Sequence, residues 1–184
     1  VVYLTKAFLP WMFPRARRAV VLDFDLVFNG PIDLLWAEFD KFSESNIIGL
    51  AQEFSRDIYA NFTHGVNGGV QLLHLERMRN GRYEQMLHQL ASSQSPGNPV
   101  GYLGDQTLYT SIAEIWPETL FRLSCKFNYQ LNNRRAARNY RCNDGCIVMH
   151  GNDPSWKTLF QSMTKTSNWQ PQLRKELLPM YNIS

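Results

Sequence analysis

Two aspartates, separated by one residue, follow an apolar run and carry the sharpest chemical signal in the sequence. Asp23 and Asp25 come directly after 19–22, a β-branched run that predicts a buried strand. Carboxylates at the end of such a strand can point into the crevice where open α/β sheets bind ligands. Their hard oxygen atoms suit Mg²⁺ or Mn²⁺, which in turn bridge phosphate oxygens. The pair predicts a metal and phosphate site, and the plainer interpretation is a turn with two solvated acids.

Two chemistries compete for this pair of carboxylates. In a haloacid-dehalogenase-like phosphatase, Asp23 would be the nucleophile and Asp25 the acid/base, and the run to Val27 fits that pattern literally. In a nucleotide-sugar glycosyltransferase, both would hold a metal on the donor diphosphate. The phosphatase also needs a late acidic pair for its metal, and no such pair follows a strand-like run. The glycosyltransferase is therefore favoured, and the phosphatase stays as the alternative.

A glycine-rich segment later in the chain offers close backbone approach to a ligand. The sequence of 65–69 reads Gly-Val-Asn-Gly-Gly and predicts a flexible bend before an apolar run. Gly68 and Gly69 let the backbone come near a ligand, and the Asn67 amide can both donate and accept hydrogen bonds. A turn without any binding role is the plainer interpretation.

Two further segments place polar side chains at the ends of predicted elements. Asp105 and Gln106 stand at a predicted helix N-terminus, where capping alone explains the aspartate. His150 ends a short predicted strand, where its imidazole could complete a metal site. A histidine with a purely structural hydrogen bond is the alternative.

Strands and helices alternate along the chain, which predicts an α/β fold with parallel strands. No repeat, linker or second-domain boundary is visible, so 1–184 is interpreted as one domain. The expected strands are 19–22, 46–51, 70–75, 120–123 and 146–149, and the expected helices are 1–13, 32–39, 76–90, 105–116, 157–163 and a C-terminal one.

Composition excludes several classes of protein. Of the 184 residues 44% are hydrophobic and 19% charged, which excludes a disordered chain. A net charge of +3 is too weak to indicate a nucleic-acid partner. No apolar run reaches the length of a membrane span. Three cysteines allow one bridge in three ways or none, and two glycosylation sequons begin at Asn61 and Asn182.

Taken in order, these segments resemble glycosyltransferase family 8. Within it the chain is most similar to the glucoside and xyloside xylosyltransferases, which extend O-glucose on EGF repeats. The resemblance implies a glycosyltransferase A-type, Rossmann-like fold with a mixed, mainly parallel sheet whose early strands are missing here. The segments that carry the closer resemblance are 7–10, 103–106, 125–130 and 150–152.

The resemblance also implies the residues of the site. The metal ligands would be Asp23, Asp25 and His150, and the ion would be Mn²⁺ or Mg²⁺. Asp105 and Gln106 would be catalytic, with Gln106 steadying the oxocarbenium-like centre. The residues that bind the donor would be Asn67, Gly68, Gly69, Asp105, Gln106, Gly151 and Asn152. No nucleophilic carboxylate stands out, so the retaining transfer is expected to be a front-face substitution.

Substrate and compartment follow from the same resemblance. The expected reaction transfers xylose from UDP-xylose to a glucose- or xylose-bearing glycan on EGF-like repeats. The expected compartment is the lumen of the endoplasmic reticulum or Golgi, with the anchor of a type II membrane protein in a missing N-terminal segment. An oxidising lumen makes a disulfide plausible, and Cys125–Cys142 is preferred over the other pairings. Without the uridine-binding strands, residues 1–184 alone are expected to bind UDP poorly, or to be a non-catalytic fragment.

Overall fold

The computed structural model describes residues 2–54, 65–92, 103–131, 142 and 145–151. In these ranges the chain forms, in order, the 3₁₀ helix η1 (Val2–Phe8), α1 (Leu9–Met12), β1 (Ala19–Leu22), β2 (Leu26–Phe28), α2 (Asp33–Trp36), η2 (Ala37–Lys41), β3 (Ile48–Gln52), β4 (Val66–Leu73), α3 (Leu75–Met78), α4 (Arg82–Ser92), α5 (Asp105–Ile115), η3 (Pro117–Thr119), β5 (Leu120–Arg122), η4 (Cys125–Phe127), β6 (Tyr129–Gln130) and β7 (Val148–His150). The helices expected at 157–163 and at the C-terminus lie outside the described residues, as do both sequons and Asn152.

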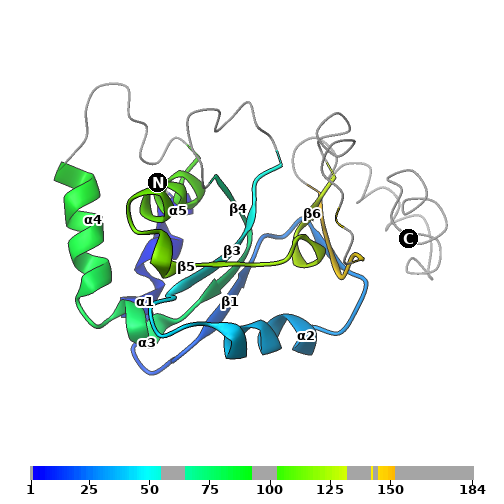
Figure 1. Cartoon of the computed structure of the whole chain (residues 1–184), viewed down its shortest axis with the longest axis horizontal. Coiled ribbons are helices and arrows are strands. Elements are labelled where there is room, and N and C mark those ends of the chain that lie inside the picture. The colour runs from blue at the N-terminus through cyan, green and yellow to red at the C-terminus, as the bar shows by residue number, and fades with distance from the viewer. Residues whose placement is uncertain (1, 55–64, 93–102, 132–141, 143–144, 152–184) are drawn as a thin grey trace.

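The strands form two sheets that meet side by side (Figure 1). The first has the order β1-β4-β3-β5, with β4 antiparallel to both β1 and β3 and with β5 parallel to β3. The second has the order β2-β7-β6, in which β7 is antiparallel to β2 and parallel to β6. The chain therefore changes sheets between β1 and β2, and this crossing contains the two aspartates.

The sheets are mixed, as expected, but the described strands are not mainly parallel. The pairings β1–β4, β3–β4 and β2–β7 are antiparallel, and only β3–β5 and β6–β7 are parallel. The first two antiparallel pairings share β4, which runs between β1 and β3 in the opposite direction to both. A parallel connection needs a crossover, usually a helix. The sequence predicts no helix between β3 and β4, so an antiparallel pairing is the simpler outcome.

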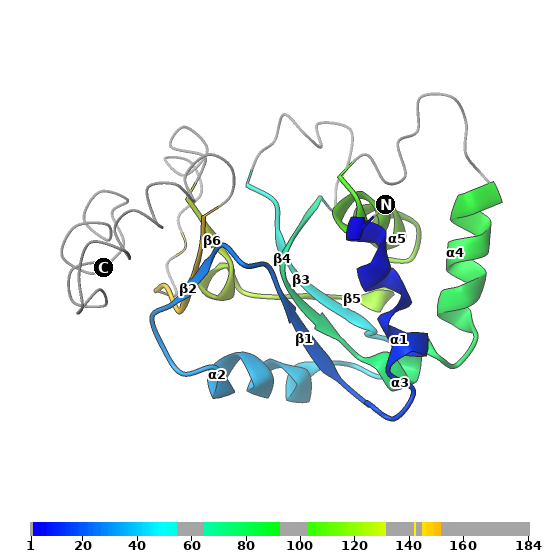
Figure 2. The same cartoon turned by 180° about the vertical axis from the view of Figure 1, so that it is seen from behind.

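Helices cover both faces of the first sheet and bury a separate apolar cluster on each. Figures 1 and 2 show α5 above the sheet and α2 below it. The α5 side buries apolar side chains from η1, β3, β4, α3, α4 and α5, with Leu73, Tyr83 and Tyr109 among them. The α2 side buries Leu35 and Phe39 against Val70 and Leu72. Residues of β4 contribute to both clusters, so this strand is the centre of the fold.

Two local expectations about this region are wrong. The segment 65–69 is not a bend, because β4 begins at Val66 and all eight of its residues are buried. The helix expected over 76–90 is divided into α3 and α4, and Gly81 between them has a φ of +87°, which favours glycine. No helix in the described ranges is long and apolar enough to span a bilayer.

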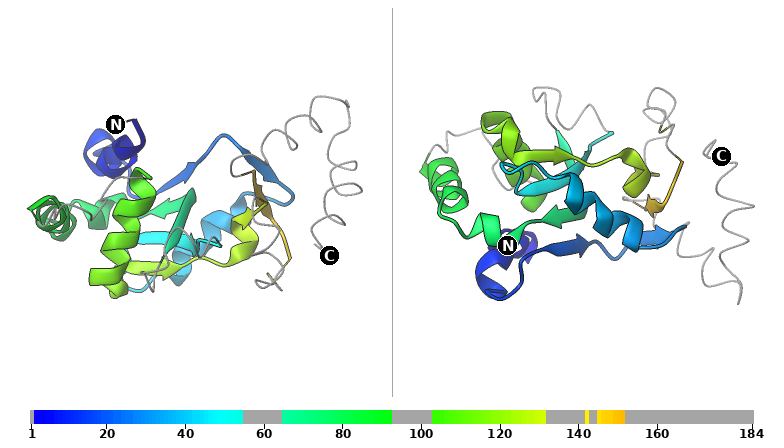
Figure 3. Two further views of the ribbon diagram at one scale, coloured as in Figure 1. Left: turned by 90° about the horizontal axis from the view of Figure 1, so that it is seen from above. Right: turned by 60° about the horizontal axis from the view of Figure 1, so that its bottom comes forward.

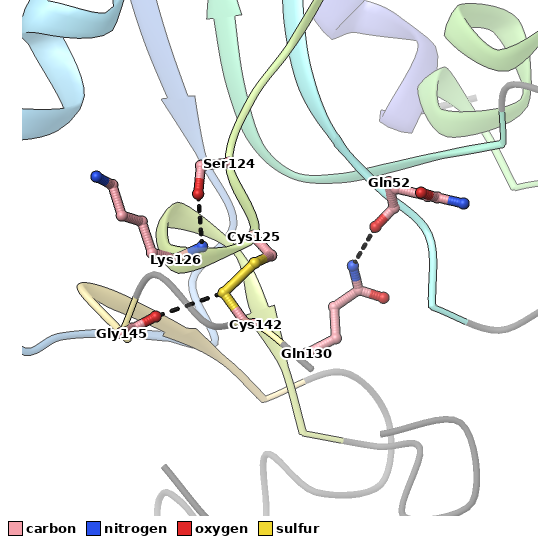
Figure 4. Close-up of a disulfide and its surroundings, with 7 residues drawn as sticks. All are labelled: Gln52, Ser124, Cys125, Lys126, Gln130, Cys142 and Gly145. Carbon is pink, nitrogen blue, oxygen red and sulfur yellow. Dashed lines mark hydrogen bonds between the residues drawn. A yellow bond between two sulfur atoms is a disulfide. The ribbon is translucent and has the colours of Figure 1, made fainter. Parts of the chain in front are cut away.

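A disulfide joins the segments that lead into the second sheet. Cys125 at the start of η4 is bonded to Cys142, with the Cα atoms 5.7 Å apart (Figure 4). The preferred pairing is therefore confirmed. Cys146 is free and buried, and burial raises the pKa of its thiol to about 12. The bridge ties the segment before β6 to the segment before β7.

Removal of this bridge tests how much it contributes to stability. Because the bond closes a loop of 17 residues in sequence, replacing both Cys125 and Cys142 by Ser should lower the free energy of unfolding by about 3 kcal/mol. Urea unfolding of both proteins measures the difference. The control is Cys146→Ala, which leaves the bridge intact and should lower the free energy of unfolding by less. Equal unfolding midpoints for the wild type and the double variant would contradict the prediction.

Candidate active site

Asp23 and Asp25 lie where the chain leaves the first sheet for the second. Figure 3 shows the blue ribbon bending at this crossing between β1 and β2. The backbone N–H of Asp23 donates to the carbonyl of Gly69 on β4 (2.9 Å), and the carbonyl of Asp25 accepts from the N–H of Gly151 after β7 (2.8 Å). Each sheet thus fixes the backbone of one aspartate, which holds both carboxylates at the junction.

The imidazole of His150 completes a cluster with these carboxylates. His150 ends β7 and pairs with Leu26 of β2, next to Asp25. Its Nε2 lies 3.3 Å from Asp25 Oδ1 and 4.0 Å from Asp23 Oδ2. One ligand atom from each of the three side chains lies within 4.8 Å of the others. The structure brings together the three expected metal ligands, and their binding of an ion stays a prediction.

A chain of buried amides fixes the orientation of the His150 ring. A carboxylate only accepts, so Glu53 Oε2 takes its hydrogen bond from Asn67 Nδ2 (2.8 Å). Asn67 Oδ1 then accepts from Asn128 Nδ2 (2.8 Å), which leaves Asn128 Oδ1 to face His150 Nδ1 (2.9 Å). Nδ1 therefore carries a proton. In a neutral ring the Nε2 lone pair is then directed at the aspartates, as a metal-binding histidine requires.

The charges and donor atoms of this cluster fit a divalent cation. Burial acts to raise the pKa of Asp25, but the hydrogen bond and charge of His150 outweigh it and lower the pKa overall. Carboxylate oxygens together with one imidazole nitrogen form a donor set that suits Mn²⁺ and related ions.

Lys6 of η1 joins the metal cluster to a second acidic side chain. Its Nζ lies 2.6 Å from Asp23 Oδ1 and 3.4 Å from Asp105 Oδ2. It approaches the oxygen of Asp23 that does not face His150, so the lysine and the imidazole use different oxygens. Burial acts to lower the pKa of Lys6, and the two carboxylates outweigh it and raise the pKa.

The expected donor-binding residues at the start of α5 lie against β4. Gln106 accepts from the backbone N–H of Gly68 (3.0 Å) and donates to Glu53 Oε2 (3.1 Å). Asp105 is buried at the first position of α5, and burial raises its pKa against the opposing effect of Lys6. The Lys6 bridge shows that this group adjoins the metal cluster.

The remaining expected residues have different environments. Gly69 lies directly under the His150 ring: a Cβ added there would be 2.1 Å from His150 Cε1. Gly68 is less crowded, with the nearest atom to an added Cβ at 3.4 Å. Gly151 is buried, and its N–H holds the Asp25 carbonyl. Asn152 lies outside the described residues.

Sequence reasoning missed three residues of this site: Lys6, Glu53 and Asn128. Glu53 follows β3 directly, so the argument that identified Asp23, a carboxylate just after a strand, also applies to it. Asn128 precedes a two-residue strand, which is too short to be recognised from a sequence pattern. The spacing around Lys6 predicts only a helix, and no local signal indicates its carboxylate partners.

Curated relatives of the chain are xylosyltransferases by name. The human xylosyl- and glucuronyltransferase LARGE2 is 33% identical over 163 residues, which cover 82% of this chain and 23% of that protein. Glucoside xylosyltransferase 2 of Xenopus laevis is 29% identical over 170 residues, covering 80% of this chain and 40% of that protein. The chain thus spans less than half the length of either relative. No protein-family model matches the sequence.

Solved structures with a similar fold are glycosyltransferases. The structure of mouse xyloside xylosyltransferase 1 superposes with a TM-score of 0.69 at 28% identity, covering 84% of this chain and 64% of that one. The galactosyltransferase LgtC superposes with a TM-score of 0.58 at 14% identity, covering 95% of this chain and 70% of that one, which shows the fold alone. The phosphatase alternative for Asp23 and Asp25 finds no support among these relatives.

The contrast between the two neighbouring glycines yields a test of the metal cluster. Gly69→Ala should displace the His150 ring and weaken Mn²⁺ binding at least tenfold, as loss of ligand orientation does at metal sites. Gly68→Ala adds the same methyl group at ordinary contact distance, so Mn²⁺ affinity should stay within about twofold of the wild type. Calorimetric titration with Mn²⁺ measures both, and circular dichroism checks that each variant is folded. An equal loss of Mn²⁺ affinity in Gly69→Ala and Gly68→Ala would contradict the assignment of His150 as a metal ligand.

Proposed function

We propose that the chain is a family 8 glycosyltransferase that transfers a sugar from a UDP-sugar donor with retention of configuration. Support comes from its homologues, LARGE2 and glucoside xylosyltransferase 2, and from its structural similarity to xyloside xylosyltransferase 1, which has a glycosyltransferase A-type fold. The observation that carries the proposal is the cluster of Asp23, Asp25 and His150 at the junction of the two sheets. Residues 1–184 would act as a single catalytic domain, within whatever longer polypeptide contains them.

The proposed donor is UDP-xylose. Support comes from the names of LARGE2, glucoside xylosyltransferase 2 and xyloside xylosyltransferase 1, all of which include xylosyl transfer. The proposed acceptor is a glucose- or xylose-bearing glycan on EGF-like repeats, supported by the words glucoside and xyloside in two of those names. No nucleic-acid partner is proposed, because the net charge is only +3.

The proposed cofactor is Mn²⁺, with Mg²⁺ as the alternative. Asp23, Asp25 and His150 Nε2 would hold the ion, which when bound neutralises the charge of the leaving diphosphate as a Lewis acid. The Asn128 amide keeps His150 Nδ1 protonated and so keeps Nε2 available. Lys6 places a second positive charge beside Asp23, where it offsets part of the acidic charge of the site.

On the sugar side we propose that Asp105, Gln106 and Asn67 hold the donor hydroxyls, with Gly68 and Gly69 giving the sugar close approach to β4. Two hydrogen bonds hold the Gln106 amide in place: it accepts one from the Gly68 N–H and donates one to the Glu53 carboxylate. A group held in this way can stabilise positive charge at the reacting carbon without reorganising. No nucleophilic carboxylate is assigned, so the proposed transfer is a front-face substitution with Gln106 beside the reacting centre. Gly151 and Asn152 are proposed to line the diphosphate side.

The proposed compartment is the lumen of the endoplasmic reticulum or the Golgi, where the full protein would be a type II membrane protein. The Cys125–Cys142 disulfide supports this placement, because disulfides persist mainly in oxidising compartments.

Substitution of one metal ligand tests the proposed function. Asp25→Asn removes a charge and a metal-binding oxygen at nearly constant volume, so transfer should fall to background while the fold is retained. The control is Asp33→Asn, the same change on the exposed first turn of α2, which should transfer at the wild-type rate. Release of UDP from UDP-xylose in the presence of acceptor and Mn²⁺ measures both in the complete natural polypeptide. Normal turnover by Asp25→Asn would contradict the metal assignment, and no turnover by the wild type with any UDP-sugar would favour a non-catalytic chain.

His150 is tested by the metal dependence of the same reaction. His150→Ala removes the only nitrogen ligand proposed, so a higher Mn²⁺ concentration should be needed for half-maximal turnover. An unchanged Mn²⁺ titration would make the histidine a structural residue.

A further inference from the structure

Gln71 is a polar residue in the most buried part of the first sheet. It lies in the middle of β4, paired with Val21 on β1 and Leu50 on β3, and its side chain has no solvent exposure. Its neighbours along the strand, Val70 and Leu72, are fully buried apolar residues. An amide at such a position costs free energy unless its hydrogen bonds are satisfied.

The hydrogen bonds of this amide are divided unequally between its two ends. Gln71 Nε2 donates to the carbonyl of Gly68 (2.8 Å) and to Oδ2 of Asp105. Both partners only accept, so the assignment of nitrogen and oxygen in this amide is fixed. Gln71 Oε1 is buried and has no hydrogen-bond partner within the described residues.

This imbalance indicates what the residue is for. A leucine or methionine at this position would fill the space without a buried carbonyl oxygen that lacks a partner, and such an oxygen costs about 1–3 kcal/mol. What the amide supplies and an apolar side chain cannot are its two N–H bonds, one to the carbonyl of Gly68 and one to Asp105. Of the two, only the bond to Asp105 reaches a side chain that is expected to touch the donor.

The bond from Gln71 controls the geometry of the Asp105 carboxylate. The Lys6 ammonium approaches the same oxygen, Oδ2, from η1 (3.4 Å). Both donors converge on this one oxygen, so together they fix the orientation of the carboxylate. Gln71 also holds the carbonyl of Gly68, whose N–H is bonded to Gln106. The two glutamines therefore hold this stretch of β4 against the start of α5.

We propose that Gln71 is a positioning residue that orients the Asp105 carboxylate to accept a hydrogen bond from a hydroxyl of the donor sugar. This inference rests on the proposed function, since it assigns the sugar of a UDP-sugar to Asp105. Gln71 acts on the sugar half of the donor only: its described side-chain bonds reach Gly68 and Asp105, and none reaches the Asp23–Asp25–His150 cluster.

The test compares the affinities for UDP-xylose and for UDP, each with Mn²⁺, in the complete natural polypeptide. Gln71→Met keeps the volume and removes the N–H donor. It should weaken binding of UDP-xylose roughly tenfold, as loss of a hydrogen bond to a charged group does, and leave binding of UDP within about twofold. The unfolding midpoint should fall only slightly, because the loss of the two hydrogen bonds is partly offset by removal of the buried oxygen that has no partner. The inference would be overturned if Gln71→Met weakened the binding of UDP-xylose and of UDP equally, or changed neither affinity.

Two further variants separate positioning from a structural role. Asp105→Ala should abolish the difference between wild type and Gln71→Met, because a residue that acts through Asp105 has no effect once Asp105 is removed. Gln130→Met is the matched control: this buried glutamine is bonded at both ends, to Phe54 N and Gln52 O, and its replacement should lower the unfolding midpoint. The inference would be overturned if the double variant Gln71→Met, Asp105→Ala lost as much affinity for UDP-xylose as the two single variants lose in sum. A wild type that binds neither UDP nor UDP-xylose would instead refute the proposed function, and this inference with it.

Discussion

The His150 ring lies directly over the backbone of Gly69, with no room for a Cβ between them, and the geometry of the site follows from this contact. It sets how closely the second sheet approaches the first. The backbone of Asp23 is hydrogen-bonded to Gly69, and that of Asp25 to Gly151, the residue after His150. The approach of the two sheets therefore also sets the distance between the two carboxylates. If the sheets were further apart, Asp25 and the His150 imidazole would move together with the second sheet, away from Asp23 on the first.

The polar residues of β4 connect the two halves of the site. Asn67 is linked through Asn128 to His150 on the metal side. Gly68 and Gln71 are linked to the start of α5 on the sugar side. Buried polar groups of this kind stabilise a fold only when their hydrogen bonds are complete. The strand therefore specifies one arrangement of the site, at the cost of polar groups in the middle of the core.

How far the sequence predicts this arrangement differs between its parts. Asp23, Asp25 and His150 are predictable as candidate ligands because each follows or ends a predicted strand. That these strands belong to two different sheets, which meet at the site, shows only in the structure. The course of β4 is not predictable, because the glycines at 68 and 69 look like a bend. They lie within the strand instead, where Gly69 allows the close approach of the His150 ring. Lys6 and Gln71 lie in helical and apolar patterns, respectively, and only the tertiary structure shows their carboxylate partners. For the disulfide, the resemblance implies only an oxidising compartment. The preference for Cys125–Cys142 comes from its longer loop, and the structure contains this bond.

The central claim is that the junction of the two sheets binds the metal that carries the donor diphosphate. Crystals of the complete natural polypeptide grown with Mn²⁺ and UDP, with diffraction recorded at the manganese absorption edge, test it most directly. The account predicts one strong anomalous peak within bonding distance of Asp23, Asp25 and His150 Nε2, with the UDP diphosphate as a further ligand. A peak bound by other residues, or UDP bound with no manganese at this cluster, would contradict it.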